Sequence, residues 1–209
     1  LGFGLVPVVI AACLGLQLAM NSRLAWEKFG LAFAWKRVWD PVMEDFGALP
    51  FLYGTIVSSA LSIAIAMPLG LGAAIFLAEL CPRRVSDSLS FLIELLAAIP
   101  SVIIGLMGIF VLVPAVRSIE PFLDQYLGFL PFFRGAPYGV GMLSAGLVLT
   151  IMILPYITSV SREVLLAVPR PLKEGALALG ATPWETLRAV SLPYARSGIL
   201  ASVFLALGR

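Results

Sequence analysis

The chain has 209 residues, of which 60% are hydrophobic and 12% are charged, and its mean hydropathy is +1.02. Soluble domains carry about 25% charged residues, so half that fraction at this hydropathy predicts an integral membrane protein. The net charge of +2 is too small to indicate a nucleic-acid partner, and the absence of histidine argues against His-based catalytic triads and most zinc sites.

Apolar segments of spanning length recur along the chain and predict an all-α, polytopic helix bundle with about five transmembrane segments. We expect these segments at residues 1–20, 51–80, 89–116, 138–160 and from Tyr194 onward. The first four are long enough to cross about 30 Å of hydrocarbon at 1.5 Å per residue. Pro68, Pro100 and Pro155 fall inside predicted spans, where membrane helices tolerate kinks. The last segment offers only about sixteen residues, so we expect a fragment truncated at both ends.

The second segment carries a row of small residues spaced four apart, which predicts a helix-packing face. The row comprises Gly54, Ser58, Ser62, Ala66, Gly70, Ala74 and Ala78. Small residues at this spacing let helix backbones approach closely, and close packing drives association in lipid. A segment rich in Ala, Gly and Ser also forms such rows by chance. The row does not indicate any particular activity. The segment ends at Glu79, which we expect to face the headgroups near Arg83 and Arg84 and to serve in structural pairing.

Charged connections separate the apolar segments, but their Lys and Arg content does not decide the topology. The connections at 21–50 and 117–137 hold six Lys or Arg residues, and those at 81–88 and 161–193, with Arg196 at the membrane edge, hold seven. The positive-inside rule needs a clearer difference than six against seven. Three Trp residues in the first connection indicate a stretch that lies at the headgroup level.

The most informative motif is the polar stretch EGALALGATPWETLRAVSLP at residues 174–193. We expect a short helix over 172–179 that ends at Gly180, since glycine commonly terminates helices. The following TPWE at 182–185 has the form of an N-cap, a proline at the first helical position and an acid at the third. Two short helices joined at Gly180 predict a compact knob. An ordinary amphipathic interfacial loop is the alternative interpretation.

The spacing of this motif resembles the cytoplasmic loop motif of ABC importer permeases: EAA, three residues, G, nine residues, I, one residue, LP. The matching residues are Glu174, Gly175, Ala176, Gly180, Val190, Leu192 and Pro193, with Gly175 in place of Ala and Val190 in place of Ile. The resemblance implies a bundle of the type I ABC importer permease kind, in which these residues couple the chain to an ATPase. It also implies that 161–193 is a cytoplasmic coupling loop, so that 21–50 and 117–137 are extracytoplasmic.

Four further runs are similar to the PstC-type phosphate permease subfamily and extend the resemblance over nearly the whole chain. They are FGLAFAWKRVWDP (29–41), IELLAAIPS (93–101), IMILPY (151–156) and LPYARSGI (192–199). The resemblance implies that residues 1–209 form a single permease domain, truncated at its C-terminus, in a bacterial inner membrane. It also implies a PstA-type partner permease, a homodimeric ATP-binding subunit and an extracytoplasmic phosphate-binding protein, and hence no catalytic residue or cofactor on this chain.

Arg209 is the candidate for direct contact with substrate. A helix that begins near Tyr194 places it about 22 Å along the helix axis, a depth at which charged residues usually face a cavity or a partner. Arg209 shares a helix face with Gly198, Ser202 and Leu205, and this face is a candidate lining for a passage. A guanidinium matches the oxygens of a tetrahedral oxyanion. A structural ion pair is the alternative role.

The leading hypothesis is therefore a transmembrane subunit of an ATP-driven importer of inorganic phosphate, in a lipid bilayer. Importers of other oxyanions, such as molybdate, sulfate or phosphonate, share the loop motif and remain an alternative. A secondary transporter, an intramembrane enzyme and a membrane scaffold are alternatives from other classes. The absence of histidine and of paired carboxylates at mid-membrane argues against the first two.

Overall fold

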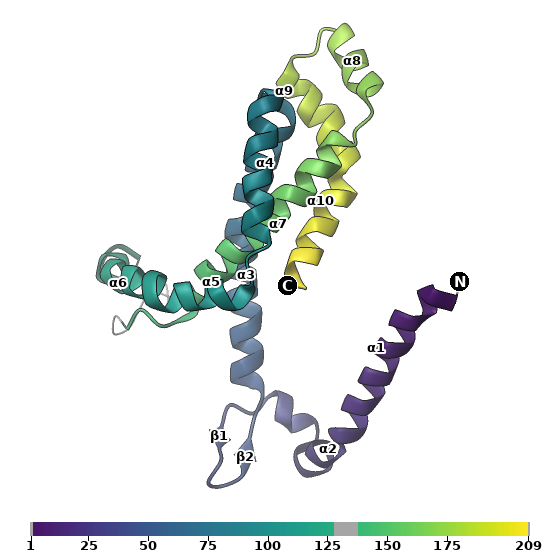
Figure 1. Cartoon of the computed structure of the whole chain (residues 1–209). Coiled ribbons are helices and arrows are strands. Elements are labelled where there is room, and N and C mark those ends of the chain that lie inside the picture. Colours follow the sequence, from purple (N-terminus) through teal and green to yellow (C-terminus); the bar gives the residue numbers. More distant parts are fainter. Residues whose placement is uncertain (1, 128–137, 209) are drawn as a thin grey trace. The chain divides into compact units, whose positions relative to one another are not determined.

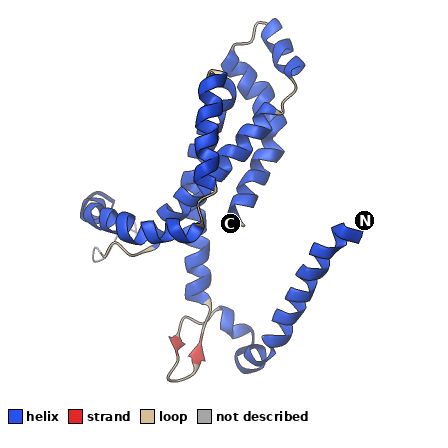
Figure 2. Cartoon of the chain, viewed as in Figure 1, coloured by secondary structure: helices blue, strands red, loops and turns tan. Residues whose placement is uncertain are grey.

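Helices dominate the computed structural model, which describes residues 2–127 and 138–208 (Figures 1 and 2). Within these residues, five helices are long and apolar enough to cross a membrane. They are Gly4–Asn21, Leu49–Leu80, Ser101–Tyr126, Met142–Leu166 and Pro183–Leu207. The prediction of an all-α polytopic bundle with about five spans is confirmed. The chain divides into two compact units, residues 1–55 and 56–209.

The first unit consists of a long apolar helix, a short helical segment and a small hairpin. Its elements are α1 (Gly2–Asn21), α2 (Arg23–Phe29), the 3-10 turn η1 (Gly30–Ala34), β1 (Trp39–Asp40) and β2 (Asp45–Phe46), followed by the first turns of α3 (Leu49–Ile75). The two strands pair antiparallel. None of the span Gly4–Asn21 is buried by the rest of the chain, and an all-round apolar helix of this kind is typical of a membrane span.

Aromatic rings hold the hairpin of the first unit together. The ring of Trp39 lies 4.9 Å, centroid to centroid, from the rings of both Phe46 and Phe51, in edge-to-face geometry. Such pairs contribute about 0.5–1.5 kcal/mol each beyond their buried area. On the polar side of the hairpin, Lys28 donates a hydrogen bond to the carboxylate of Glu44, and this bond lowers the pKa of Glu44.

The second unit is a helix bundle in which α7 has the central place. Its elements after α3 are the π-helical turn η2 (Phe76–Leu80), α4 (Arg83–Ala97), α5 (Ser101–Met107), the π-helical turn η3 (Gly108–Leu112), α6 (Val113–Leu127), α7 (Met142–Leu166), α8 (Arg170–Ala178), α9 (Pro183–Thr186), the π-helical turn η5 (Leu187–Ser191) and α10 (Leu192–Leu207). Helix α7 makes its most extensive contacts with α10 and α4. Figure 1 shows α8 and α9 together at one end of this unit.

Small side chains form the contact between α3 and α7. The buried residues of α3 are Ser62, Ala66, Gly70 and Ala74, all members of the predicted row. A Cβ atom added at Gly70 would lie 3.0 Å from Cγ2 of Ile157 on α7, and Ile157 itself is fully buried. The predicted packing face is confirmed for these four residues, because larger side chains would hold the two backbones apart.

The face of α10 that carries Gly198 and Ser202 packs against α7 and lines no passage. The hydroxyls of Ser202 and Ser161 lie 3.0 Å apart, and both side chains are fully buried. A Cβ atom at Gly198 would lie 2.5 Å from Cγ1 of Val164. The predicted passage lining is therefore wrong at these two positions, because the small residues serve close helix packing. Leu205, by contrast, is exposed.

The third predicted span, residues 89–116, is wrong because the helix breaks at Pro100. Helix α4 ends before this proline and α5 begins after it, while Pro100 itself has an extended backbone with ψ 134°. Proline lacks an N–H donor and disfavours helical geometry in the residue before it. The apolar span is Ser101–Tyr126 instead. Pro68 and Pro155 do lie inside helices, as predicted.

The last span begins at Pro183, eleven residues before the predicted start near Tyr194, because α9, η5 and α10 form one continuous helix. This helix, Pro183–Leu207, has 25 residues and is long enough to cross a membrane. The prediction of a segment too short to span is therefore wrong. Pro193 did not end the helix because the π turn just before it already rearranges the backbone hydrogen bonds.

We predict that Gly70→Leu destabilises the second unit by about 1–3 kcal/mol, because the new side chain would displace the neighbouring α7. Gly72→Leu is the matched control on the same helix, since a Cβ atom there meets nothing within 4 Å. Thermal unfolding of both purified variants in detergent measures the difference. Equal unfolding temperatures would show that the α3–α7 contact is not tight.

Candidate functional site

The turn after α8 explains why the 174–193 motif has a glycine at position 180. The N–H of Ala181 donates to the carbonyl of Ala176 at 3.1 Å, and the N–H of Gly180 donates to the carbonyl of Leu177 at 3.0 Å. These two bonds form a Schellman motif, which closes a helix with a left-handed residue. Gly180 has φ +89°, a conformation that favours glycine. The predicted helix end at Gly180 is confirmed.

A capping box begins the next helix immediately after this turn. The N–H of Glu185 donates to Oγ1 of Thr182 at 3.3 Å, and the N–H of Thr182 donates to Oε2 of Glu185 at 2.8 Å. Pro183 occupies the first helical position, where its missing N–H costs nothing. The predicted N-cap is confirmed, but the helix that it starts continues into α10, so the predicted second short helix is wrong.

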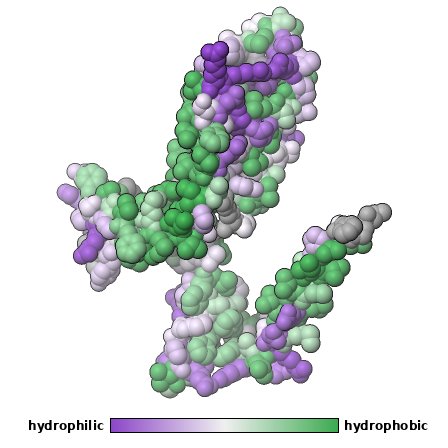
Figure 3. Space-filling model, in the orientation of Figure 1, coloured by the Kyte–Doolittle hydropathy of each residue, from purple (hydrophilic) through white to green (hydrophobic). Residues whose placement is uncertain are grey.

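Helix α8 and the turn that follows it are largely exposed and carry both polar and apolar side chains. Glu174 and Gly175 are exposed, and no residue of α8 is buried. Leu179 is 92% exposed and Trp184 is 63% exposed, so two large apolar groups flank the turn at Gly180. Figure 3 shows hydrophilic residues concentrated toward this end of the second unit, with apolar residues over the flank below it. Apolar groups exposed within a polar end are typical of a protein-binding surface.

The second half of the motif belongs to the helix bundle and not to the exposed turn. Leu192 packs against a buried cluster that joins α3, α7 and α10. The cluster comprises Ala74, Leu165, Val168, Ala195 and Ile199. Val190 is partly buried and Pro193 is exposed on the continuous helix. The motif therefore links an exposed helix, α8, to the packed core through the rigid start of the last span.

A half-buried ion pair connects α8 to η2, the π-helical turn that follows α3. Nζ of Lys173 lies 2.7 Å from Oε1 of Glu79, and it also donates to the carbonyl of Leu165 at 3.4 Å. The predicted structural pairing of Glu79 is confirmed, and its partner is Lys173, because the fold brings residue 173 to residue 79. Sequence reasoning missed Lys173, since no pattern signals a contact 94 positions apart.

A second polar link holds α4 against α7. The guanidinium of Arg162, whose side chain is 11% exposed, donates to Oγ of Ser86 and to Oδ1 of Asp87, each at 3.2 Å from Nη2. Its Nη1 also lies 2.8 Å from Oε1 of Glu163. These partners identify Arg162 as a structural cation. It belongs to the first residues of the predicted 161–193 loop, which the structure places in the last turns of α7, up to Leu166.

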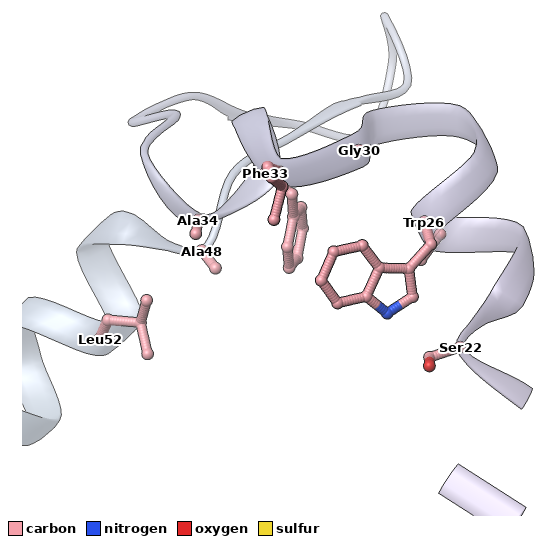
Figure 4. Close-up of a pocket in the computed structure, with 9 residues that line it drawn as sticks. Ser22, Trp26, Gly30, Phe33, Ala34, Ala48 and Leu52 are labelled. Atoms are coloured by element: carbon pink, nitrogen blue, oxygen red, sulfur yellow. The ribbon is translucent and has the colours of Figure 1, made fainter. Parts of the chain in front are cut away.

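The described residues form both polar and apolar hollows. A small one between α4 and α7 is lined by polar side chains that include Ser90, Glu94 and Arg162. In the first unit an apolar hollow of about 320 Å³ lies between α2, η1 and the start of α3. Figure 4 shows Trp26 and Phe33 facing it from one side and Ala48 and Leu52 from the other. Residues 2–127 and 138–208 contain no group of three or more potential metal ligands. Arg209, the candidate for substrate contact, lies outside the described residues.

Comparison with known proteins identifies relatives over nearly the whole chain. The family model of the binding-protein-dependent transport system inner membrane component matches residues 66–209. The phosphate transport system permease protein PstC of Mesorhizobium japonicum is 44% identical over 98% of this chain and 64% of its own length. PstC of Haemophilus influenzae is 45% identical over 99% of this chain and 67% of its own length. PstC 2 of Mycobacterium tuberculosis is 44% identical over 81% of this chain and 54% of its own length.

The two glycines at this site should respond in opposite ways to replacement by alanine. Gly180→Ala forces a side chain into a left-handed conformation and should destabilise the chain by about 1–2 kcal/mol. Gly175→Ala should stabilise α8 by up to about 1 kcal/mol, because a Cβ atom there meets nothing within 4 Å. Thermal unfolding, together with the rate of limited proteolysis at the turn, tests both. A shift of the same sign in both variants would contradict the turn geometry.

Proposed function

Because the chain belongs to the family of binding-protein-dependent transport system inner membrane components, and within it to the PstC-type phosphate permeases, we propose that it is a transmembrane subunit of an ATP-driven phosphate importer. The chain is a multi-pass membrane protein, and its family comprises transport components and not enzymes. In this proposal it forms half of the translocation path in a bacterial inner membrane. A separate homodimeric subunit binds and hydrolyses ATP, so this chain needs no cofactor.

The exposed helix α8 is the observation that carries the coupling role. It stands apart from the buried clusters, it presents the Glu174 carboxylate outward, and Leu179 and Trp184 beside it are exposed. A carboxylate with flanking apolar groups suits a groove that has a basic residue and an apolar wall. We assign that groove to the ATPase subunit, whose movement α8 would transmit to the bundle.

The coupling role also sets the orientation. With α8 on the cytoplasmic side, residues 21–50 are extracytoplasmic. So is the predicted connection at 117–137, of which 128–137 lie outside the described residues. An extracytoplasmic phosphate-binding protein would deliver substrate on that side, and a PstA-type permease would supply the other half of the path. Arg209 remains the candidate for contact with the oxyanion, because a guanidinium matches its oxygens.

We predict that Glu174→Arg abolishes ATP-dependent phosphate uptake by the complete importer in vesicles, because the reversed charge would repel the basic partner group. The expected loss is at least about tenfold, as for one member of an interfacial charge pair. Arg23→Glu is the control, since Arg23 makes only an exposed pair with Glu27 in the first unit. Normal uptake by Glu174→Arg would disprove the coupling role of α8.

Substrate identity is tested by competition. Unlabelled phosphate should suppress uptake of labelled phosphate by the wild-type importer, whereas molybdate, sulfate and phosphonate at equal concentration should leave most of it. The measurement is the initial rate of ATP-dependent uptake into vesicles that contain the binding protein. Stronger suppression by one of the other oxyanions would assign the permease to that anion instead. Uptake that does not depend on ATP would indicate a secondary transporter.

A further inference from the structure

We propose that Lys173 and Glu79 form the positioning link through which movement of α8 reaches the membrane helix α3. The link rests on the transport function proposed above and names residues for it outside the 174–193 motif. Nζ of Lys173 contacts Oε1 of Glu79 at the end of α3 and the carbonyl of Leu165 in the last turn of α7. One ammonium group thus joins three helices: α8, α3 through η2, and α7.

The position of Leu165 makes this site suitable for a cation. The last four carbonyls of a helix lack partners within it, and the C-terminal end of the helix carries partial negative charge. Leu165 belongs to this last turn of α7 and is fully buried, and besides Lys173 its carbonyl accepts a long hydrogen bond of 3.4 Å from the N–H of Val168. Lys173 therefore interacts favourably with both a carboxylate and a helix end, which a neutral or acidic residue at this place would not do.

Burial distinguishes this pair from the ion pairs of the first unit. The side chains of Lys173 and Glu79 are each 19% exposed, whereas those of Arg23 and Glu27 are 80% and 57% exposed. Exposed pairs are screened by water and contribute little, while loss of one partner from a shielded pair leaves an uncompensated charge. Of these two pairs, the shielded pair of Lys173 with Glu79 is the one suited to keep α8 and the end of the α3 span at a fixed distance while they move.

Glu79 lies in a segment whose backbone geometry suits it to transmit movement of α8 to α3. It belongs to the π-helical turn η2, in which the N–H of Cys81 bonds to the carbonyl of Phe76. The carbonyl of Leu77 in the same turn accepts a hydrogen bond from Ser86 of α4 at 2.8 Å. π-helical turns are rare and occur frequently at functional sites.

Two routes from α8 into the bundle pass through a π-helical turn, in addition to the direct backbone connection to α7 through residues 167–169. One route is covalent, through Gly180 and α9 to η5 (Leu187–Ser191) and the last span. The other is the ion pair, which leads to η2 and then to the small-residue face of α3 against α7. Without the ion pair, α8 would still dock on the ATPase, and its movement would reach α7 and the last span through the backbone, but α3 would lose its direct link to α8.

The experiment compares phosphate uptake with ATP hydrolysis in the complete reconstituted importer. The variants are Lys173→Glu, Glu79→Lys, the double exchange of both, and the neutral double variant Lys173→Met/Glu79→Gln. Arg23→Glu, which breaks the exposed pair, is the matched control. The measured quantity is the amount of phosphate transported per ATP hydrolysed, with both rates normalised to the amount of assembled complex.

The single variants should lower the ratio of phosphate to ATP by about tenfold, with ATP hydrolysis retained, because each leaves a shielded charge unpaired. The double exchange should recover the ratio to within about threefold of wild type; recovery is incomplete because the Leu165 carbonyl still favours a cation at position 173. The neutral double variant leaves no unpaired charge, so it should assemble even if the single variants do not. Its ratio should also fall.

An unchanged ratio in the neutral double variant, within about twofold of wild type, would overturn the inference, as would a double exchange no better than the single variants. A purely structural role would lower uptake and hydrolysis in parallel and leave their ratio constant. The two proposals also fail separately. If Glu174→Arg abolishes uptake while the Lys173 and Glu79 variants keep the wild-type ratio, only the positioning link is disproved. If the wild-type complex shows no ATP-dependent uptake, the transport function itself is wrong.

Discussion

Close approach of helix backbones at small residues is the constraint on which the rest of the second unit depends. Lipid surrounds apolar side chains as favourably as protein does, so the helices gain little from burying them and must gain from tight packing. A methyl group added at Gly70 would lie 3.0 Å from Ile157 and one at Gly198 would lie 2.5 Å from Val164, so the neighbouring side chains would have to move to admit either. Serine hydroxyls lie inside these interfaces, as in the contact between Ser161 and Ser202, while large apolar side chains face outward.

This packing brings together the helix ends from which the candidate site is built. Because α3 and α10 both pack on α7, the end of α3, the end of α7 and the start of the last span lie close to one another. Helix α8 bridges them through the ion pair of Lys173 with Glu79 and through the turn at Gly180. Both connections lead from the exposed turn to helices that are packed along their length, and this is the property that a coupling element requires.

Local chemistry made much of the site predictable. The helix end at Gly180 and the N-cap at Thr182 follow from short-range preferences of glycine, threonine and proline, and both are present. The packing row follows from spacing alone, and four of its seven members are buried in α3. The errors lie where local signals compete. Pro100 ends a helix although Pro68 does not, and Pro193 lies in a helix that continues through it.

The sequence by itself determined the membrane class, the number of apolar spans, the turn at Gly180 and the family motif, since each depends on composition or on residues within one or two turns of helix. Only the tertiary structure decided that Gly198 and Ser202 face α7, and that the partner of Glu79 is Lys173. Such contacts depend on which helices pack together and in what register. That choice is made by many small contacts summed along whole helices, and no short segment carries it.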